Sequence, residues 1–445
     1  MTRVILATAL AAALQAAADQ PPEADEAVTL EQAVRMALDR HPDVGKARAA
    51  ADALRGKVRE VRAQALPDVT INANGLRLRD PSLLNASGLD KFPKELRDAL
   101  VPEGVNLFDY HVRVRQPLYT AGKVGTALKL AAVEAEGSQI EVDRAEHDLA
   151  LEVVRAFYGL LWAERYRVLV EQTLQQKRRH AEMARTRFAL GVATEVDVLR
   201  SEVAVANVQP DLVRAENAVR QARALLNFYL VRPIDFPTRA AGELLEQPWE
   251  EENLEELAQD AIRRRPDLHR LRIAERSAGV QLDLARAESR MRADLDAAYG
   301  ISSRFLENLA NGKYARWSVS VNFTLPVFDG FRRSGLVWQA TAAQRAARLE
   351  REKAEQQVRL ALRQSLDELR AARQTIAAAR ANVREAERVL EMIENNYRHG
   401  AATTLDVMDA QTALALARTN LLKGLYDYSV ARANLRWALG RTPWE

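Results

Sequence analysis

The chain has 445 residues and no cysteine, and its 64 Lys and Arg against 61 Asp and Glu leave a net charge of +3. This near balance of charge gives no basis for a nucleic-acid partner, and the lack of cysteine excludes disulfides, thiolate metal sites, catalytic thiols and a lipid-modified N-terminal cysteine. The six histidines match no metal-protease spacing and no phosphate-binding glycine loop or nucleophile elbow occurs, so we predict no cofactor, no metal site and no catalytic residue.

The first residues have the pattern of an export signal. Arg3 precedes an apolar stretch over residues 4–18, which ends in the small residues Ala16, Ala17 and Ala18. The stretch is shorter than the roughly 20 residues that span a bilayer as a helix, and no later segment is as apolar. We therefore predict a signal peptide over 1–18 and a mature protein that begins near Asp19, with an ordinary amphipathic helix as the alternative.

Four segments alternate apolar and polar residues with the period of a β-strand. The clearer two alternate at Phe108, Tyr110, Val112 and Val114, and at Trp317, Val319, Val321, Phe323 and Leu325. The weaker two alternate at Val69, Ile71 and Ala73, before a phase slip at Gly75, and at Leu295, Ala297, Tyr299 and Ile301. We predict four strands of about ten residues, the length that crosses a bilayer when tilted. A soluble, half-buried sheet would alternate in the same way.

Two segments without proline, from Pro117 to Pro210 and from Pro326 to Pro443, permit long helices. In the second, a heptad seam is formed by Leu362, Leu369, Ile376, Val383, Leu390 and Tyr397. In the first, the same spacing joins Val153, Leu160, Leu174, Ala181 and Phe188, with Arg167 as an interruption. We predict coiled-coil helical hairpins whose helices have about 60 residues and reach roughly 90 Å.

The chain also contains one pattern twice. Residues 188–199 return as residues 397–408, and the two glycines of this phrase are 209 positions apart, from 400 minus 191. The segment that begins near Leu30 likewise returns near Leu254. A fixed internal period indicates two copies of one structural unit. We predict one body over 19–445 made of two structural repeats, about 28–233 and 252–443, with a linker over 234–251.

The four strands have an implication for assembly if they lie in a bilayer. Lipid tolerates no open sheet edge, and four strands cannot close a barrel, so several chains need to contribute strands together. Two chains would give eight strands around a filled interior, whereas three would give twelve around an aqueous bore. The alternating Asp, Arg, Ser, Asn and Thr suit a wet interior. The helical hairpins would continue such a bore as a second, helical cylinder.

These features resemble the TolC-like outer membrane efflux proteins along nearly all of the mature chain. The resemblance rests on the duplication, on the turn with Gly122 after Pro117, on its counterpart over 325–330, and on the phrase from Gly400 to Gln411. It implies a mainly α fold with a small β portion: a homotrimer with a long periplasmic α-barrel and a twelve-stranded outer-membrane β-barrel surrounded by lipid. It further implies the exit duct of a tripartite efflux or secretion system in a Gram-negative outer membrane, docked on a periplasmic adaptor protein and an inner-membrane pump.

The resemblance also assigns Asp406, Asp409 and Tyr397 to a gate at the periplasmic entrance. Asp409 follows Asp406 by three residues, so both lie on one helix face and three chains would bring them together. Converging carboxylates would raise one another's pKa values and attract cations. Two alternatives stay open: Asp406 as a capping partner of Thr403, and Tyr397 as a core residue. Ala402 stands where some relatives carry a linking arginine, which predicts a leakier closed state.

The same resemblance places adaptor docking at the helix tips. The residues concerned are Gly191, Thr194, Asp197, Gly400 and Thr403. Each also has a purely structural reading, because the glycines fit left-handed helix ends and Thr194 with Asp197 fits a cap.

Two other functions are weighed against a channel. An exported periplasmic coiled-coil protein of structural or adaptor type would share the helices, and only insertion of the strands into detergent would separate it from a channel. An exported hydrolase lacks any nucleophile or metal constellation. The transported substrate and the class of pump stay open, and the segment 80–106 is predicted to lengthen one extracellular loop.

Overall fold

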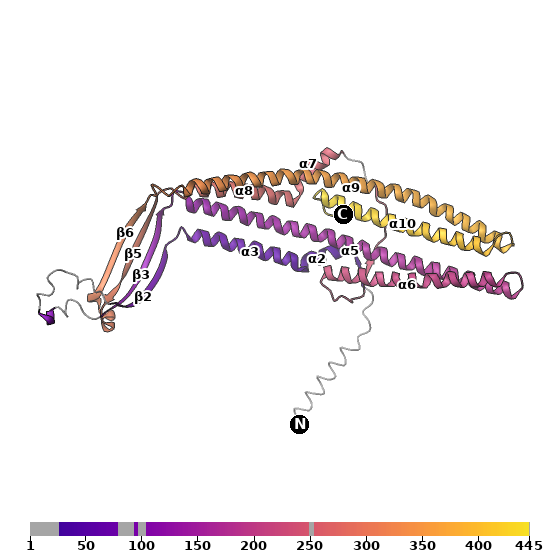
Figure 1. The fold of residues 1–445 in the computed structure, drawn as a ribbon, viewed down its shortest axis with the longest axis horizontal. Coiled ribbons are helices and arrows are strands. Elements are labelled where there is room, and N and C mark those ends of the chain that lie inside the picture. Colours follow the sequence, from indigo (N-terminus) through magenta and orange to yellow (C-terminus); the bar gives the residue numbers. More distant parts are fainter. Residues whose placement is uncertain (1–25, 79–92, 97–103, 249–252, 445) are drawn as a thin grey trace, which may run out of the picture. The chain divides into compact units, whose positions relative to one another are not determined.

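The computed structural model describes residues 26–78, 93–96, 104–248 and 253–444 (Figure 1). The predicted signal peptide and most of the predicted 80–106 loop lie outside these ranges. Two compact units divide the chain. Unit 1 comprises the described parts of Met1–Ala49, Gln139–Arg270 and Glu352–Glu445, and unit 2 comprises those of Ala50–Ser138 and Leu271–Arg351.

The elements occur in two series of the same order, and corresponding helices have nearly equal lengths. The first is β1 (Glu26–Thr29), α2 (Leu30–Arg40), α3 (Pro42–Ala63), β2 (Asp68–Leu78), β3 (Val105–Tyr119), α5 (Lys123–Ala189) and α6 (Glu195–Leu230). The second is β4 (Thr238–Ala241), α7 (Leu254–Arg264), α8 (Pro266–Ala287), β5 (Arg292–Ser303), β6 (Ala315–Thr324), α9 (Arg332–Arg398) and α10 (Thr404–Ala438), with short 3-10 turns η3 (Leu306–Ala310) and η4 (Gly312–Tyr314) between β5 and β6. The predicted fold class, mainly helical with a small strand portion, is confirmed.

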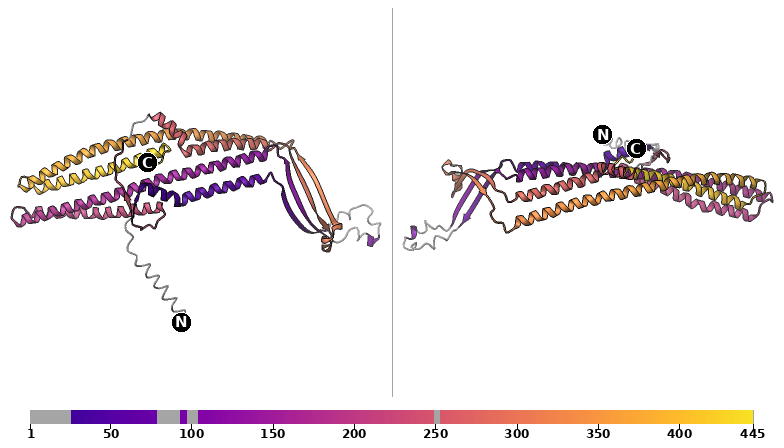
Figure 2. Two further views of the ribbon diagram at one scale, coloured as in Figure 1. Left: turned by 180° about the vertical axis from the view of Figure 1, so that it is seen from behind. Right: turned by 90° about the horizontal axis from the view of Figure 1, so that it is seen from above.

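The two long helices have the same length. Both α5 and α9 contain 67 residues, which at 1.5 Å per residue is roughly 100 Å. Each turns into a shorter partner, α6 with 36 residues or α10 with 35, and the two hairpins lie side by side in both views of Figure 2. Among the described residues, no helix is both long and apolar enough to cross a membrane.

The heptad seams form much of the core of unit 1. The seam residues that are buried are Leu362, Leu369, Ile376, Leu390 and Tyr397 of α9 and Val153, Leu160, Leu174 and Ala181 of α5. The prediction is wrong for Phe188, whose side chain is 47% exposed at the end of α5. Arg167, the predicted interruption, is half-buried and pairs with Glu171 one turn later at 3.1 Å. Charge at that position is therefore satisfied within the helix itself.

A small parallel sheet in unit 1 was not predicted. Val28 of β1 pairs with Ala240 of β4, and both strands have only four residues, too few for an alternating pattern to be read. Thr29 ends β1 and caps α2 in a reciprocal capping box with Gln32. The capped helix packs its buried face on the same core cluster as Phe157 of α5.

Unit 2 contains an antiparallel four-stranded sheet in the order β2-β3-β5-β6. All four predicted strands are present. The predicted phase slip at Gly75 is wrong, because β2 stays in continuous register with β3 and Gly75 pairs with Phe108. The irregularity lies instead in β3, between Pro117 and Tyr119, where proline has no N–H to donate to the ladder.

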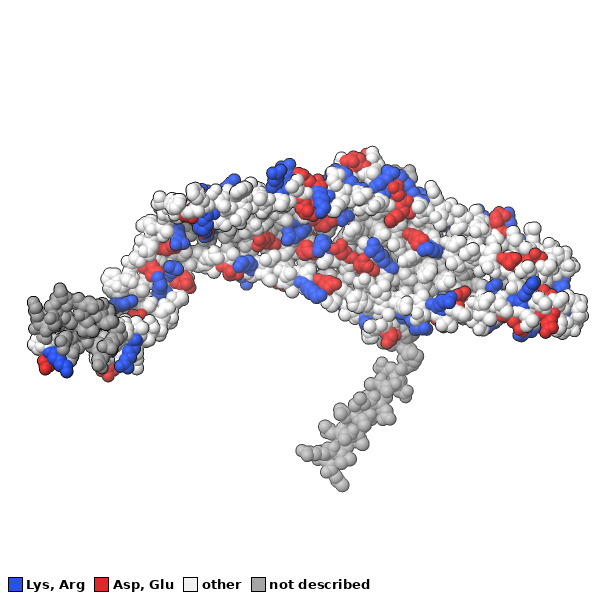
Figure 3. All heavy atoms as spheres, in the orientation of Figure 1, with Lys and Arg blue, Asp and Glu red and all other residues white. Residues whose placement is uncertain are grey.

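The space-filling view in Figure 3 shows basic and acidic side chains interspersed over the described helices, without a large area of one sign. Many are paired, as Arg418 of α10 is with Glu387 of α9 at 2.7 Å and Arg380 of α9 is with Glu246, in the segment after β4, at 2.7 Å. Exposed pairs of this kind contribute little stability, about 0–1 kcal/mol each. The helical portion therefore derives its stability from the seams rather than from its surface charges.

Candidate functional site

The residues predicted to gate or dock all lie at the ends of the two hairpins. We call residues 186–200, where α5 meets α6, the first tip, and residues 395–409, where α9 meets α10, the second tip. Both belong to unit 1.

Glycine ends the long helix at each tip. Gly191 has φ 75° and Gly400 has φ 79°, the left-handed region that favours glycine. The next N–H donates back to a carbonyl five residues earlier, from Val192 to Arg187 at 2.9 Å and from Ala401 to Asn396 at 2.8 Å. This is the hydrogen-bond pattern of a Schellman helix end, so the structural reading of both glycines is confirmed. Their part in docking stays a prediction.

A threonine and an aspartate then cap the next helix at each tip. The Thr194 N–H and hydroxyl donate to Asp197 Oδ2 at 3.0 and 2.7 Å, and those of Thr403 donate to Asp406 Oδ2 at 2.8 and 2.7 Å. The capping role of Asp406 is therefore confirmed. The Thr403 hydroxyl and backbone N–H hold the pKa of Asp406 below its ordinary value, so within one chain this carboxylate is ionised at neutral pH.

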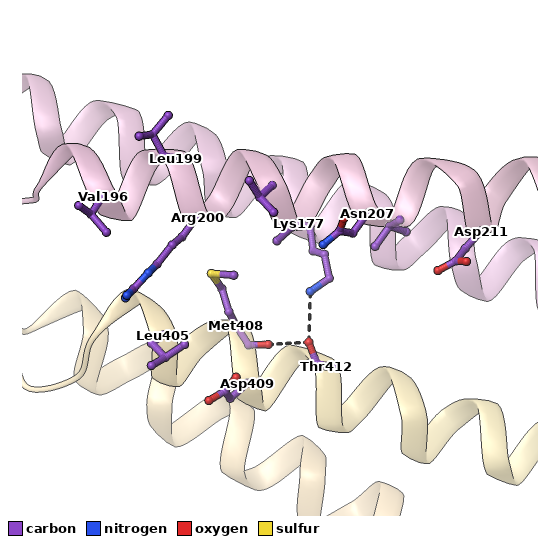
Figure 4. Close-up of a pocket in the computed structure, with 13 residues that line it drawn as sticks. Lys177, Val196, Leu199, Arg200, Asn207, Asp211, Leu405, Met408, Asp409 and Thr412 are labelled. Atoms are coloured by element: carbon purple, nitrogen blue, oxygen red, sulfur yellow. Dashed lines mark hydrogen bonds between the residues drawn. The ribbon is translucent and has the colours of Figure 1, made fainter.

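Asp409 has no capping role, and it lies on an exposed part of α10. It lines a groove of about 640 Å³ between the two hairpins, which we call the tip groove (Figure 4). The groove is lined mainly by apolar side chains of α6 and α10, among them Val196, Leu199, Val203, Leu405 and Met408. Its charged members are Lys177, Arg200, Asp211 and Asp409. Positions 200 and 409, which correspond in the sequence repeat, thus line one groove with opposite charges.

Tyr397 is 5% exposed and joins the two hairpins. Its hydroxyl shares a hydrogen bond with Thr404 Oγ1 at 3.2 Å. Arg187 of the first tip lies over its ring, with the guanidinium 4.5 Å from the centroid, and donates to its carbonyl oxygen at 2.8 Å. The His180 ring lies beside the Tyr397 ring, with the two centroids 5.5 Å apart. The core reading of Tyr397 is confirmed, and a gate role stays a prediction.

One hydroxyl connects the capping residues of the first tip to this cluster. The pKa of Asp197 is lowered chiefly by the Thr194 side chain and backbone, and a hydrogen bond from Thr404 lowers it further. Thr404 also shares a hydrogen bond with Tyr397, so Asp197 and Tyr397 are both bonded to the same residue. Asp406 and Asp409 stay exposed on α10 and outside this cluster.

The sequence reasoning missed Arg187 of the first tip and, earlier on α5, Lys177 and His180. Burial lowers the pKa of His180, and the nearby Lys177 charge lowers it further, so the imidazole is neutral at neutral pH. His180 Nε2 is buried and has no hydrogen-bond partner among the described residues. A polar residue at a buried position of a helix with heptad spacing is the sequence signal that could have identified Lys177 and His180.

The sheet of unit 2 has one polar and one apolar face. Paired positions share a face, so Asp109, His111, Arg113 and Arg115 of β3 lie with Asn72 and Thr70 of β2 and with Asp296 and Ser320 across β5 and β6. Arg113 binds Asp296 through both Nε and Nη2, at 2.9 and 2.6 Å, and His111 Nδ1 lies 2.7 Å from Asp109 Oδ2. The charges of Arg113 and Asp296 on this face thus neutralise each other between β3 and β5.

The opposite face of the sheet is apolar and exposed. On this face, Ile71 of β2 is 77% exposed, and Trp317 and Phe323 of β6 are 75% and 70% exposed. An exposed apolar face of this extent indicates contact with lipid or with another protein surface. No group of three or more His, Cys, Asp or Glu that could hold a metal ion occurs in the described part of the chain.

Comparison with known proteins gives consistent matches. Residues 33–230 and 257–441 match the sequence model of the family described as outer membrane efflux protein. Outer membrane protein TolC of Vibrio cholerae is 24% identical over 423 residues, which cover 93% of this chain and 91% of that protein. Outer membrane protein OprJ of Pseudomonas aeruginosa is 26% identical over 426 residues, with 92% and 84% covered. The CmeC outer membrane channel of Campylobacter jejuni has the same fold, with a TM-score of 0.80 at 16% identity over 92% of this chain and 85% of that chain.

Proposed function

The chain belongs to the outer membrane efflux protein family, and from this premise we propose that three copies form the exit duct of a tripartite efflux or secretion system. The protein is then a channel of the Gram-negative outer membrane with a large periplasmic helical portion, and not an enzyme. Its two structural repeats are about 28–233 and 252–443, and they are joined by a linker over 234–251 that contains β4. Substrates pass from an inner-membrane pump through the helical portion and leave through the strands.

The two-faced sheet is the observation that carries this proposal. Its apolar face suits lipid, its polar face suits water, and β2 and β6 each have one edge without a partner strand in the described residues. An unpaired edge in hydrocarbon leaves backbone groups without hydrogen bonds, at several kcal/mol each. Pairing β6 of one copy with β2 of the next removes both edges. Three copies give twelve strands and an aqueous bore, whereas two would give a filled barrel.

We place the gate at the second tip. Asp406 and Asp409 are exposed on α10, one turn apart, so a threefold arrangement of α10 around the axis would produce two rings of carboxylates. The cap keeps Asp406 ionised in each chain, which supports a cation-attracting ring there. Tyr397 would act indirectly, because its contacts with Arg187 and Thr404 fix the second tip against the first.

A periplasmic adaptor protein would bind the tips, including Gly191, Thr194, Asp197, Gly400 and Thr403. The apolar lining of the tip groove also supports binding of a helix there. A Gly400→Val variant tests this assignment, because the left-handed φ disfavours a β-branched side chain. Lost transport with normal trimer assembly would support docking, while misassembly would show a backbone role alone.

Conductance of the purified, detergent-solubilised protein in a planar bilayer tests the channel. We expect discrete openings, with larger conductance and weaker block by Mg²⁺ in a variant that carries Asp406→Ala and Asp409→Ala. Asp427→Ala is the matched control, because Asp427 is a carboxylate lower on α10 that pairs with Lys423. A conductance and Mg²⁺ block unchanged in the double variant would remove both residues from the gate.

The same experiment separates the channel from the alternative. An exported periplasmic coiled-coil protein without channel activity would stay in solution without detergent and produce no openings. Well-folded protein that behaves in this way would overturn the proposed function.

A further inference from the structure

A lysine occupies a core position of α5. Along this helix, positions spaced by seven are filled by Ala163, Val170, Lys177 and Ala184, and all four are buried, Lys177 with 8% exposure. The position that corresponds to it in the second series, 177 plus 209, is Ala386. A small apolar residue would therefore satisfy the packing. Burying an ammonium group in its place is unfavourable, and burial lowers the pKa of Lys177 accordingly.

The ammonium group reaches the other hairpin. Lys177 Nζ donates to Thr412 Oγ1 of α10 at 3.3 Å, and Figure 4 shows its side chain extending from α5 across the tip groove toward this hydroxyl. Asp409 lies three residues before Thr412, one turn away on the same helix, and lines the same groove. The Asp409 charge acts on Lys177 in the direction opposite to burial, since it favours the ammonium form.

The other two charged residues of the tip groove, Arg200 and Asp211, have opposite charges. Arg200 extends from α6 toward the start of α10 in Figure 4, and Asp211 lies further along α6. Without Lys177 the groove would contain one cation and two carboxylates. The lysine is thus the group that makes the charge of the groove neutral beside Asp409.

We propose that Lys177 is a selectivity-determining residue of the channel, a buried counter-charge that weakens the negative potential which the Asp409 carboxylates present to passing cations. The inference rests on the proposed gate and adds a residue to it. Three copies would place three ammonium groups behind the carboxylate ring. Because they are buried, salt screens them less than it screens surface charges, so their effect on the ring persists at physiological ionic strength.

Lys177→Met tests the proposal, because methionine keeps most of the buried side-chain volume and removes the charge. We expect Mg²⁺ to block the variant at about tenfold lower concentration, since one fewer positive charge faces a divalent ion at each of three sites. The reversal potential in a KCl gradient should shift toward greater cation selectivity. Lys177→Arg should behave as the wild type does. Arg178→Met is the matched control, because it removes the same charge one residue later from an exposed position.

The outcomes separate this proposal from the gate itself. If Asp409→Asn alters selectivity and Mg²⁺ block while Lys177→Met leaves both at wild-type values, the counter-charge role is wrong and the gate stands. If Asp409→Asn has no effect either, the gate assignment fails and this inference fails with it. In an Asp409→Asn background, Lys177→Met should add no further change. A lysine with only a packing role would alter the melting temperature in these variants and leave the reversal potential unchanged.

Discussion

Removal of the Arg187 guanidinium should loosen the second tip. Arg187 makes two contacts with Tyr397: a charged hydrogen bond of 2.8 Å to the carbonyl oxygen and a cation–π contact of 4.5 Å to the ring. A hydrogen bond from a charged donor contributes roughly 1.5–3 kcal/mol, and a partly exposed cation–π contact about 0.5–1 kcal/mol. Arg187 is half-buried, so the lower values apply, and the pair together contributes about 2 kcal/mol per chain.

A change of about 2 kcal/mol corresponds to roughly a 30-fold change in the equilibrium between a fixed and a released tip. Single-channel recording of Arg187→Met should therefore show a markedly larger open probability, and Arg187→Lys, which keeps charge but not the planar contact, a smaller increase. Arg185→Met is the control, because it removes a nearby guanidinium whose partner, Glu202 at 2.7 Å, lies inside the first hairpin. Equal open probabilities in Arg187→Met and the wild type would refute the reasoning. Arg187 also links the two hairpins, from a position other than 402. The leakier closed state that we predicted from Ala402 therefore depends on whether the Arg187 link is present.

Three further outcomes follow from the described contacts. Gly300→Ala should abolish trimer formation on a native gel, because a Cβ there would overlap the Tyr110 carbonyl oxygen, while Gly312→Ala, whose Cβ would meet no described residue within 4 Å apart from its chain neighbours, should assemble normally. Thermal melting at graded pH should show stability falling below about pH 6.5, because burial lowers the pKa of His180 and the unfolded chain therefore takes up the proton first. The charged groups around His180 are Lys177, Arg179, Arg398 and Glu394. The variant His180→Gln should reduce this pH dependence. Thr403→Ala should destabilise the protein by about 1 kcal/mol in chemical unfolding, because it removes the helix cap. Since folding lowers the pKa of Asp406, the stability that this cap contributes is present above the ordinary aspartate pKa and is lost as pH falls through the folded pKa. An unchanged profile in His180→Gln or an unchanged unfolding midpoint in Thr403→Ala would contradict the corresponding argument.

The long elements were predictable because their patterns extend over many residues. The seam of α9 repeats over five heptads, and the apolar and polar alternation of β6 continues over ten residues. Patterns of this length do not arise by chance, so each predicts its element. The caps were predictable for a different reason: Thr403 and Asp406 are local partners, and their spacing alone determines the hydrogen bonds.

The remainder depended on contacts between segments far apart in the chain. β1 and β4 are too short for a period and pair across more than two hundred residues. Phe188 follows the seam spacing, but it lies one residue before the end of α5 and stays exposed. Arg187 has no sequence signal, because its partner is the backbone and ring of Tyr397 in the other hairpin. Spacing predicts which face of a helix a residue occupies, and it does not predict what that face meets.

The differences between corresponding positions argue for a division of labour between the tips. Glycine ends the long helix and a Thr–Asp pair caps the next one at both, so the backbone is built in the same way. Side chains that differ include buried Tyr397, which corresponds to exposed Phe188, and Asp409, which corresponds to Arg200 and lines the tip groove with it. On the same backbone, these differences give the second hairpin both the exposed Asp409 carboxylate and the bonds that fix its position. The second tip is therefore the part expected to move and to select, and the first hairpin, which supplies Lys177 and Arg187, is the part against which it is fixed.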